Sequence, residues 1–204
     1  MGRPAVPTGL ANRRISAGPR RIQKGRTVRP FALLPLLAVL TLPLVACQEE
    51  EAQLPPAPVA LTQSALSYFC QMNISEHGGP KGQVHLNGFP APLFFAQVRD
   101  LVAYLKGPER EADITAVYVS DMGIAPSWAA PGIDNWILAD EAFFVIESNV
   151  AGGMGAPEIV PFARAEDAEE FAARYGGTVT SLAQMPAETA LGPVDLDQAL
   201  ETPS

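Results

Sequence analysis

Apolar residues recur along the chain at two kinds of spacing, one typical of helices and the other typical of strands. Between positions 94 and 106 they fall at 94, 98, 101, 102 and 105, and between 165 and 175 they fall at 168, 171, 172 and 175. This i, i+3, i+4, i+7 spacing predicts two amphipathic helices. A Gly-Pro pair follows the first segment and a Gly-Gly pair the second, and both pairs are typical of helix ends.

Short runs rich in β-branched and aromatic residues predict five strands between turn-forming residues. They lie at 83–86, 114–120, 143–147, 158–163 and 178–182. Such a mixture of strands and helices predicts an α+β fold for residues 64–185, a length sufficient for one compact domain.

The two halves of this region resemble each other. In each half a Phe-Ala pair is followed, after three residues, by Asp and then by an aromatic residue four positions later. The two sets are Phe95, Ala96, Asp100 and Tyr104, and Phe162, Ala163, Asp167 and Phe171. Because each set is preceded by strand-like runs, we expect two related β-β-α units, at about 64–110 and 111–185. A coincidental match is the alternative at this length.

The first 46 residues differ in composition from the rest of the chain. Residues 1–30 carry eight basic residues and no acid, and residues 31–46 are uncharged and mostly apolar. This apolar run is shorter than the roughly 20 residues of a membrane-spanning helix, so residues 1–46 predict an export signal. The run ends in Leu-Val-Ala before Cys47, which resembles a bacterial lipobox with Cys47 as the acylated residue. An ordinary signal peptide is the alternative.

Two other segments have compositions that do not favour a core. Residues 47–63 are acidic and then rich in Pro and Ala, which predicts a flexible tether. Residues 186–204 contain Pro and acids without periodicity and predict a disordered acidic tail. From Cys47 onward 22 acidic residues stand against six basic ones. We therefore expect no nucleic-acid partner, because phosphate binding needs clustered Lys and Arg.

Motifs of several enzyme classes are missing from the sequence. It contains no GxSxG, P-loop, HExxH or CxxC motif. Apart from Cys47, the only cysteine is Cys70.

A cysteine and a methionine form the most informative pair of side chains. Cys70 and Met72 stand two residues apart, so in an extended segment both would point to the same side. Thiolate and thioether are ligands that select Cu(I) over harder ions, whereas zinc-ligand spacings are absent. The alternative is that both residues only fill the core.

A second methionine lies in a glycine-rich loop. Met154 has glycine on both sides, so its neighbours in sequence cannot bury it. If the two halves are duplicated, we expect this loop to occupy the place in the second unit that residues 70–85 occupy in the first. Cys70, Met72 and Met154 would then converge in a cleft between the units. Packing of Met154 against the core is the alternative. Possible additional ligands are His77, His85 and Met122, and for His77 a surface or turn position is the simpler interpretation.

Together these features resemble the NosL family of accessory lipoproteins in nitrous oxide reductase maturation. The resemblance covers roughly residues 66–182 and the lipobox. It is carried by Cys70-Gln71-Met72-Asn73-Ile74, Gly82-Gln83-Val84, Tyr118-Val119-Ser120-Asp121, Gly153-Met154-Gly155 and the segments 136–146 and 162–179.

The resemblance implies a fold and a set of copper ligands. The implied fold consists of two related β-β-α units similar to organomercury lyase. Cys70 and Met72 match the copper-binding C-x-M motif of the family, and Met154 matches its loop methionine. The chain departs from the family pattern at Gln71, where Gly is usual, and at Gly153, where Pro is common.

The resemblance also implies a function. We expect a Cu(I) metallochaperone in the periplasm, anchored to the outer membrane through lipidated Cys47, and not an enzyme. Its partners would be nitrous oxide reductase and the membrane complex that matures it. One alternative is a metal-free lipoprotein that acts as a scaffold for that complex. An enzyme of the organomercury-lyase type is a weaker alternative, because it requires a second thiol that the folded region lacks.

Overall fold

The computed structural model describes residues 54–195, 197, 198 and 200–203. All of them belong to one compact body. The predicted signal peptide, the lipidation site Cys47 and the first part of the tether lie outside the described residues. Among the helices of the described part, none has the length and apolar character required to cross a membrane.

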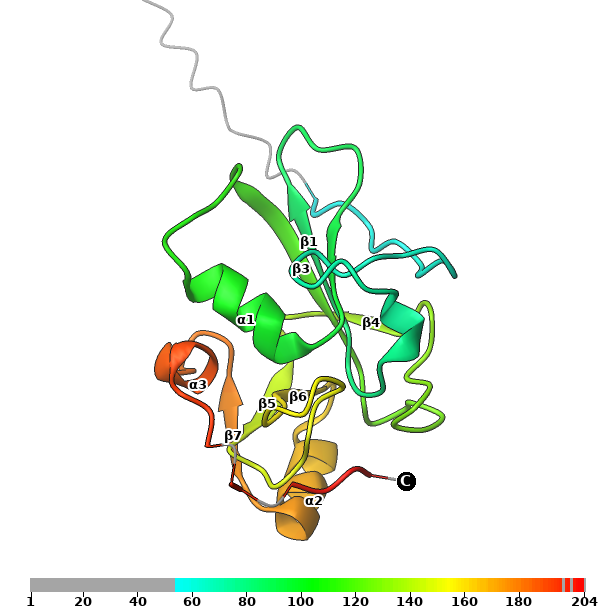
Figure 1. The fold of residues 1–204 in the computed structure, drawn as a ribbon. Helices are drawn as coiled ribbons and strands as arrows, with labels where there is room; N and C mark the ends of the chain where they lie inside the picture. The colour runs from blue at the N-terminus through cyan, green and yellow to red at the C-terminus, as the bar shows by residue number, and fades with distance from the viewer. Residues whose placement is uncertain (1–53, 196, 199, 204) are drawn as a thin grey trace, which may run out of the picture. The chain divides into compact units, whose positions relative to one another are not determined.

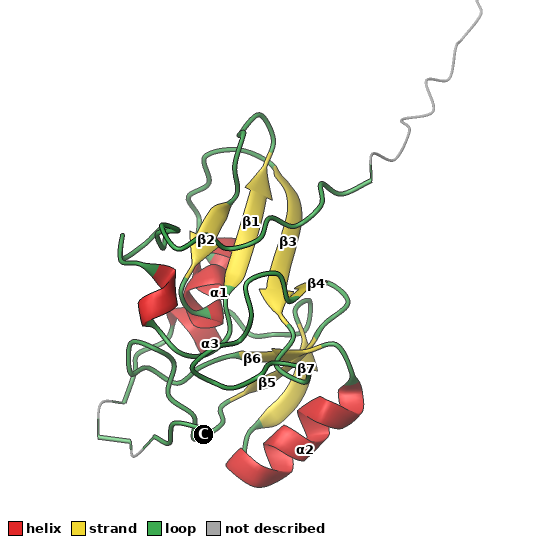
Figure 2. Ribbon diagram, turned by 90° about the vertical axis from the view of Figure 1, so that its right-hand side faces the viewer, coloured by secondary structure: helices red, strands yellow, loops and turns green. Residues whose placement is uncertain are grey.

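The first sheet contains four antiparallel strands in the order β2-β1-β3-β4 (Figure 2). Their bounds are Gly82–Leu86 for β1, Leu93–Phe95 for β2, Ile114–Ser120 for β3 and Trp136–Leu138 for β4. Gly82 of β1 lies opposite Phe95 of β2 on one side and Val119 of β3 on the other. Helix α1, Val98–Lys106, packs on β1 and β2.

The second sheet contains three antiparallel strands in the order β6-β5-β7 (Figure 1). They are β5, Phe143–Ile146, β6, Val160–Phe162, and β7, Thr178–Ser181. Helix α2, Ala165–Tyr175, packs on all three strands. The predicted α+β class and both predicted helices are therefore confirmed.

The order of elements repeats along the chain. Two adjacent antiparallel strands precede a helix, and the strand after the helix pairs with the first strand, in β1-β2-α1-β3 and again in β5-β6-α2-β7. The internal similarity detected in the sequence thus corresponds to a repeated β-β-α-β topology. The strand at 114–120, which we assigned to the second unit, pairs instead with β1 of the first sheet.

The core is shared by the two sheets. Its largest cluster of buried residues joins Val84 and Phe95 of the first sheet, Leu101 of α1, and Phe144 and Ile146 of the second sheet. A smaller cluster lies between the second sheet and α2 and includes Phe162, Ala168 and Trp128. The two repeats are therefore not independent folding units, because each completes the core of the other.

The tail does not follow the prediction. We expected residues 186–204 to be disordered, but its described part begins with helix α3, Glu188–Leu191, which packs on α1. Glu201 then forms backbone bonds with Asn149 and Ala151, at 2.6 and 2.8 Å. The reason is that acidic composition does not exclude order where the backbone finds partners on the core.

Candidate metal centre

Cys70 lies in a tight turn rather than in an extended segment. Backbone bonds of 2.9 Å run from the Gln71 N–H to the Ser67 carbonyl and from the Ser67 N–H to the Met72 carbonyl. Gln71 has a φ of +57°, in the left-handed region. The segment therefore does not adopt the extended conformation in which Cys70 and Met72 would point to the same side. The Cys70 side chain is half-buried and forms no disulfide within the described residues, and Met72 is 41% exposed.

The turn is attached to the end of β2 and to the residues that follow it. The Tyr68 N–H donates to the Phe94 carbonyl at 2.7 Å, and the Ala96 N–H donates to the Ser67 hydroxyl at 3.2 Å. Aromatic packing adds to this attachment, since the Tyr68 ring lies 5.9 Å from that of Phe95 and 5.7 Å from that of Tyr104, between centroids. The backbone on the N-terminal side of Cys70 is thereby fixed to the first sheet and to α1.

Met154 lies at the tip of the loop between β5 and β6. The loop is closed by a bond of 2.8 Å from the Gly152 N–H to the Ala156 carbonyl. The Met154 N–H donates to Gln97 Oε1 at 3.1 Å, and the side chain is 40% exposed. The loop is therefore attached to Gln97, the residue that precedes α1.

The Cys70 turn and the Met154 loop thus bind the same short segment of the chain, residues 94–97. The loop also contacts the turn after Ile74, because His77 Nδ1 lies 3.3 Å from the Gly153 carbonyl oxygen. A Cβ on Gly153 would come within 2.7 Å of the His77 Cβ, so glycine permits this approach. The structure therefore attaches the turn that carries Cys70 and Met72 and the loop that carries Met154 to one short segment, from both repeats.

The repeat topology places the two candidate ligand segments at different positions of the repeat. We expected the Met154 loop to occupy the place in the second unit that residues 70–85 occupy in the first. The loop instead joins β5 to β6 and corresponds to the β1–β2 connection, whereas the Cys70 turn precedes β1. The two candidate ligand segments are therefore not equivalent by duplication.

The other candidate ligands have different surroundings. His85 is buried on β1, where its Nε2 lies 2.9 Å from Gln83 Oε1 and its ring packs edge-on against Tyr118. Burial lowers the pKa of His85. Met122 is half-buried and packs against the cluster beneath α2. Both have the contacts of packing residues, whereas His77 contacts the Met154 loop directly and its buried Nε2 has no hydrogen-bond partner among the described residues.

Two ionisable side chains that the sequence analysis did not single out are buried beside these loops. Lys81 is 2% exposed, and its ammonium donates to the carbonyls of His77, Gly78 and Ala96 at 2.6, 3.2 and 3.1 Å. It therefore links the His77 turn to the segment that holds both candidate loops. Burial lowers the pKa of Lys81 to about 8, and the charge of Glu158 opposes this shift.

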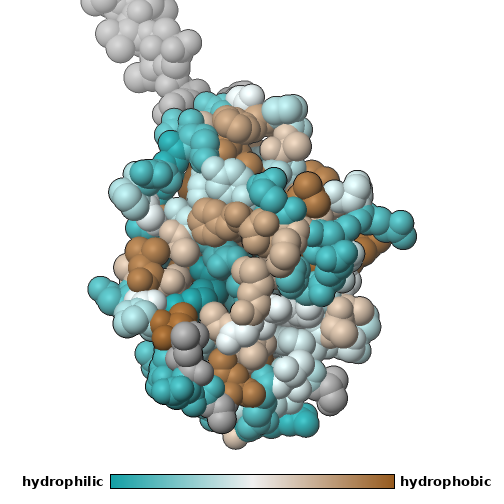
Figure 3. All heavy atoms as spheres, in the orientation of Figure 1, coloured by the Kyte–Doolittle hydropathy of each residue, from teal (hydrophilic) through white to brown (hydrophobic). Residues whose placement is uncertain are grey.

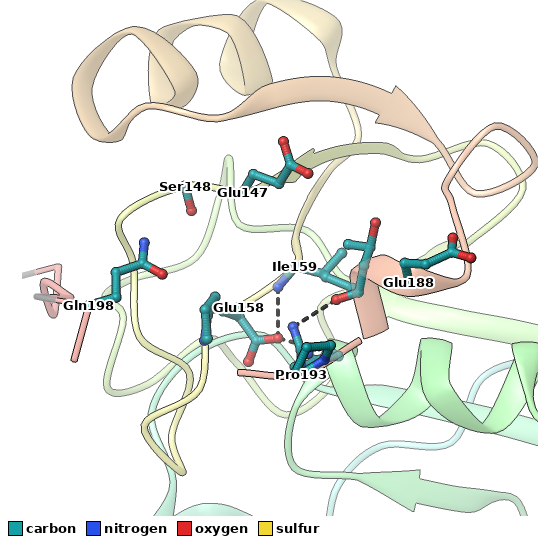
Figure 4. Close-up of a pocket in the computed structure, with 10 residues that line it drawn as sticks. Glu147, Ser148, Glu158, Ile159, Glu188, Pro193 and Gln198 are labelled. Carbon is teal, nitrogen blue, oxygen red and sulfur yellow. Dashed lines mark hydrogen bonds between the residues drawn. The ribbon is translucent and has the colours of Figure 1, made fainter. Parts of the chain in front are cut away.

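Glu158 is the second buried group and lies between the repeats. Its Oε1 accepts from the Arg99 N–H at 3.0 Å and from its own neighbour, the Ile159 N–H, at 2.9 Å (Figure 4). Burial raises the pKa of Glu158 to about 7, although these two bonds and the charge of Lys81 oppose the shift. It also lines a cavity of about 210 Å³ formed with α1 and the tail.

Apolar side chains around the Cys70 turn are exposed in an otherwise mixed surface. Leu66 and Phe69 are each 50% exposed, close to Met72 in sequence. On the face shown in Figure 3, hydrophobic residues form small groups separated by hydrophilic ones. In the described part of the chain no group of three or more His, Cys, Asp or Glu residues is arranged to hold a metal ion.

Comparisons with known proteins agree on one family. The family model for NosL matches residues 58–190. The copper-binding lipoprotein NosL of Achromobacter cycloclastes is 48% identical over 161 residues, which cover 78% of this chain and 83% of that protein. The protein of the same name from Stutzerimonas stutzeri is 35% identical over 147 residues, covering 71% and 75%.

A solved structure supports the same relationship at the level of the fold. The crystal structure of the copper chaperone NosL from Shewanella denitrificans superposes with a TM-score of 0.60 at 34% identity. The match covers 64% of this chain and 97% of that one.

Proposed function

The chain belongs to the NosL family, and from this premise we propose that it is a Cu(I) metallochaperone and not an enzyme. Its named relatives are copper-binding lipoproteins, and one is a copper chaperone. In this proposal the protein is anchored to the periplasmic face of the outer membrane through Cys47. It delivers copper for assembly of the copper–sulfide centre of nitrous oxide reductase.

One observation supports copper binding most directly. The Cys70 turn and the Met154 loop, which come from different repeats, both hydrogen-bond to residues 94–97. In the proposal, Cys70, Met72 and Met154 of these two segments supply one thiol and two thioethers to the ion. Soft sulfur ligands of this kind favour Cu(I) over harder cations.

The exposure of these ligands suits transfer of the ion. Met72 and Met154 are each about two-fifths exposed and Cys70 is half-buried, so an acceptor's ligands can reach a bound ion. Copper binds the thiolate, so loading releases the Cys70 proton. Few ligands at an open position allow the ion to be exchanged to a partner.

The test is an anaerobic Cu(I) titration of the chain from Gln48 onward, in competition with a colorimetric Cu(I) chelator. This form contains the whole compact body. We expect one equivalent of copper to be retained, and Cys70→Ser and Met154→Leu each to weaken binding at least tenfold. Met122→Leu is the matched control, because Met122 packs beneath α2, and it should bind as the parent does.

The alternative is a metal-free scaffold of the maturation complex. A parent protein that retains no copper would favour the scaffold, and Cys70→Ser would then leave reductase maturation intact. Retention that depends on Cys70 but not on Met154 would keep the proposed chaperone and remove Met154 from its site.

A further inference from the structure

Gln97 occupies an unusual position for its residue type. It is the residue before α1, where a short polar side chain usually accepts hydrogen bonds from the first helical N–H groups. The Gln97 side chain makes no such bond, although it is only 2% exposed. Its Oε1 instead accepts the Met154 N–H at 3.1 Å, while its Nε2 donates to Asp100 Oδ2 in the first turn of α1 at 3.4 Å.

Glu158 caps α1 in place of Gln97. This residue comes from the other repeat, at the C-terminal end of the connection that carries Met154, and its Oε1 accepts the Arg99 N–H in the first turn of α1. Each repeat therefore supplies a side chain that satisfies the backbone of the other. The result is a reciprocal link between the start of α1 and the β5–β6 connection.

The link leaves no space for a side chain at Gly152. A Cβ at that position would lie 2.4 Å from Gln97 Oε1 and 2.6 Å from Glu158 Oε2. Both side chains therefore touch the loop backbone close to Met154. Among the described residues the Glu158 Oε2 atom has no hydrogen-bond partner.

We propose that Gln97 is a positioning residue, which fixes the backbone of Met154 so that its thioether reaches copper held by Cys70. This inference rests on the proposed copper-binding function. Met154 has flanking glycines and an exposed side chain, so little else restricts its orientation. The partly buried bond from the Met154 N–H to Gln97 Oε1 constrains its backbone directly. Preorganised ligands bind more tightly than mobile ones.

Gln97→Leu tests the proposal, since leucine has a similar volume and no acceptor. With methionine methyl groups labelled by carbon-13, we expect Cu(I) to shift the Met72 and Met154 signals of the parent. In Gln97→Leu the Met154 signal should no longer shift, and the Met72 signal should still shift. The Cu(I) affinity of Gln97→Leu should fall about tenfold, as in Met154→Leu. The double variant that combines Gln97→Leu with Met154→Leu should bind Cu(I) no more weakly than either single variant.

Gln83→Leu is the matched control for a loss of stability. Gln83 is also fully buried and also bonds backbone groups, at Val59, but it lies on β1 away from the Met154 loop. The Gln83→Leu variant should lower the unfolding midpoint as Gln97→Leu does, but its Met154 signal should still shift when Cu(I) is added. Hydrogen exchange of the Met154 amide without copper gives a second readout, which should accelerate only in Gln97→Leu.

The outcomes separate the two proposals. A parent that retains copper, with a Met154 signal that still shifts in Gln97→Leu, overturns the positioning role and leaves the chaperone intact. If the double variant loses as much binding free energy as the two single variants together, the positioning role of Gln97 is likewise overturned. A parent that retains no copper overturns the proposed function and the role of Gln97 in it.

Discussion

Gln71 adopts a backbone conformation that few side chains favour. Its φ of +57° lies in the left-handed region, which costs a residue with a Cβ about 1–2 kcal/mol. The side chain compensates, because its Nε2 donates to the Tyr68 carbonyl at 2.7 Å and to the Ser67 carbonyl at 3.3 Å. These two bonds explain in physical terms how a residue with a Cβ can occupy this left-handed turn.

Substitutions at Gln71 should therefore separate backbone strain from side-chain bonding. Gln71→Gly removes both the strain and the two bonds, so its unfolding free energy should stay within about 1 kcal/mol of the parent. Gln71→Val keeps the strain in a β-branched residue and should cost about 2 kcal/mol. Urea unfolding measures both values. Equal midpoints for the valine variant and the parent would show that the turn is not left-handed.

Glu158 should make stability depend on pH in an unusual direction. Burial raises its pKa from 4.5 to about 7, so the folded chain holds this proton more tightly than the unfolded chain. Its stabilising contribution is present below about pH 4.5 and is lost as the pH rises through about 7. Relative to Glu158→Gln, the parent should therefore lose unfolding free energy between about pH 4.5 and about pH 7.

Urea titrations of both proteins at several pH values test this prediction. The comparison with Glu158→Gln is needed because the surface carboxylates titrate in both proteins alike. A difference that stays constant with pH would mean that Glu158 is ionised throughout in the folded state.

At the level of single residues, the sequence identified the ligand candidates but not the groups that hold them. Sulfur chemistry and glycine-rich neighbours are visible in any sequence, and so Cys70 and Met154 could be found. The roles of Gln97 and Glu158 depend on hydrogen bonds between residues far apart in sequence. Such bonds leave no pattern in the sequence, and our prediction placed Gln97 inside a helix that began at residue 94.

Helix α1 is held against the first sheet by a close contact at Gly82. A Cβ on this residue of β1 would lie 2.2 Å from the Leu101 Cδ1 atom. Gly82→Ala should therefore destabilise the protein by about 1–3 kcal/mol through overpacking. Thermal or urea unfolding gives this value directly.

A second substitution distinguishes this contact from a general effect of the alanine. Leu101→Val removes the crowded Cδ1 methyl group. Gly82→Ala and Leu101→Val should therefore together lower the unfolding free energy by less than the sum of their separate effects. If the losses of unfolding free energy from Gly82→Ala and Leu101→Val are strictly additive in the double variant, then Gly82 and Leu101 are not in close contact.

Elements with local signals were predicted well, and elements that depend on distant partners were missed. The bounds of β3 and α2 agree with the prediction, because each has an uninterrupted pattern of its own. The first helix was predicted to begin at 94, but Leu93–Phe95 forms β2, since pairing with β1 outweighs a helical spacing. The short strand β4 depends likewise on its neighbour β3.

The tail links several parts of the compact body. The Arg99 guanidinium of α1 donates to the carbonyls of Thr189 and Gly192, at 2.7 and 3.3 Å. Glu201 binds the backbone at the start of the β5–β6 connection. Removal of residues 186–204 should therefore destabilise the protein by about 2 kcal/mol or more.

Calorimetry of the shortened chain measures this effect. Removal of residues 202–204 alone is the control, because the backbone bonds made by Glu201 remain. An unchanged melting temperature after the longer truncation would restore the original prediction of a disordered tail.

The unequal lengths of two connections have a consequence for how the proposed ligand segments can change. The β5–β6 connection, residues 147–159, is more than twice as long as its counterpart between β1 and β2, residues 87–92. The additional length carries both Met154 and Glu158. The proposed thiol ligand therefore lies ahead of the first repeat, and a proposed thioether ligand lies in the longer connection of the second repeat. Natural selection on the Cys70 turn and on the β5–β6 connection is then linked, because a substitution in one segment is useful only if the other segment still supplies its ligand.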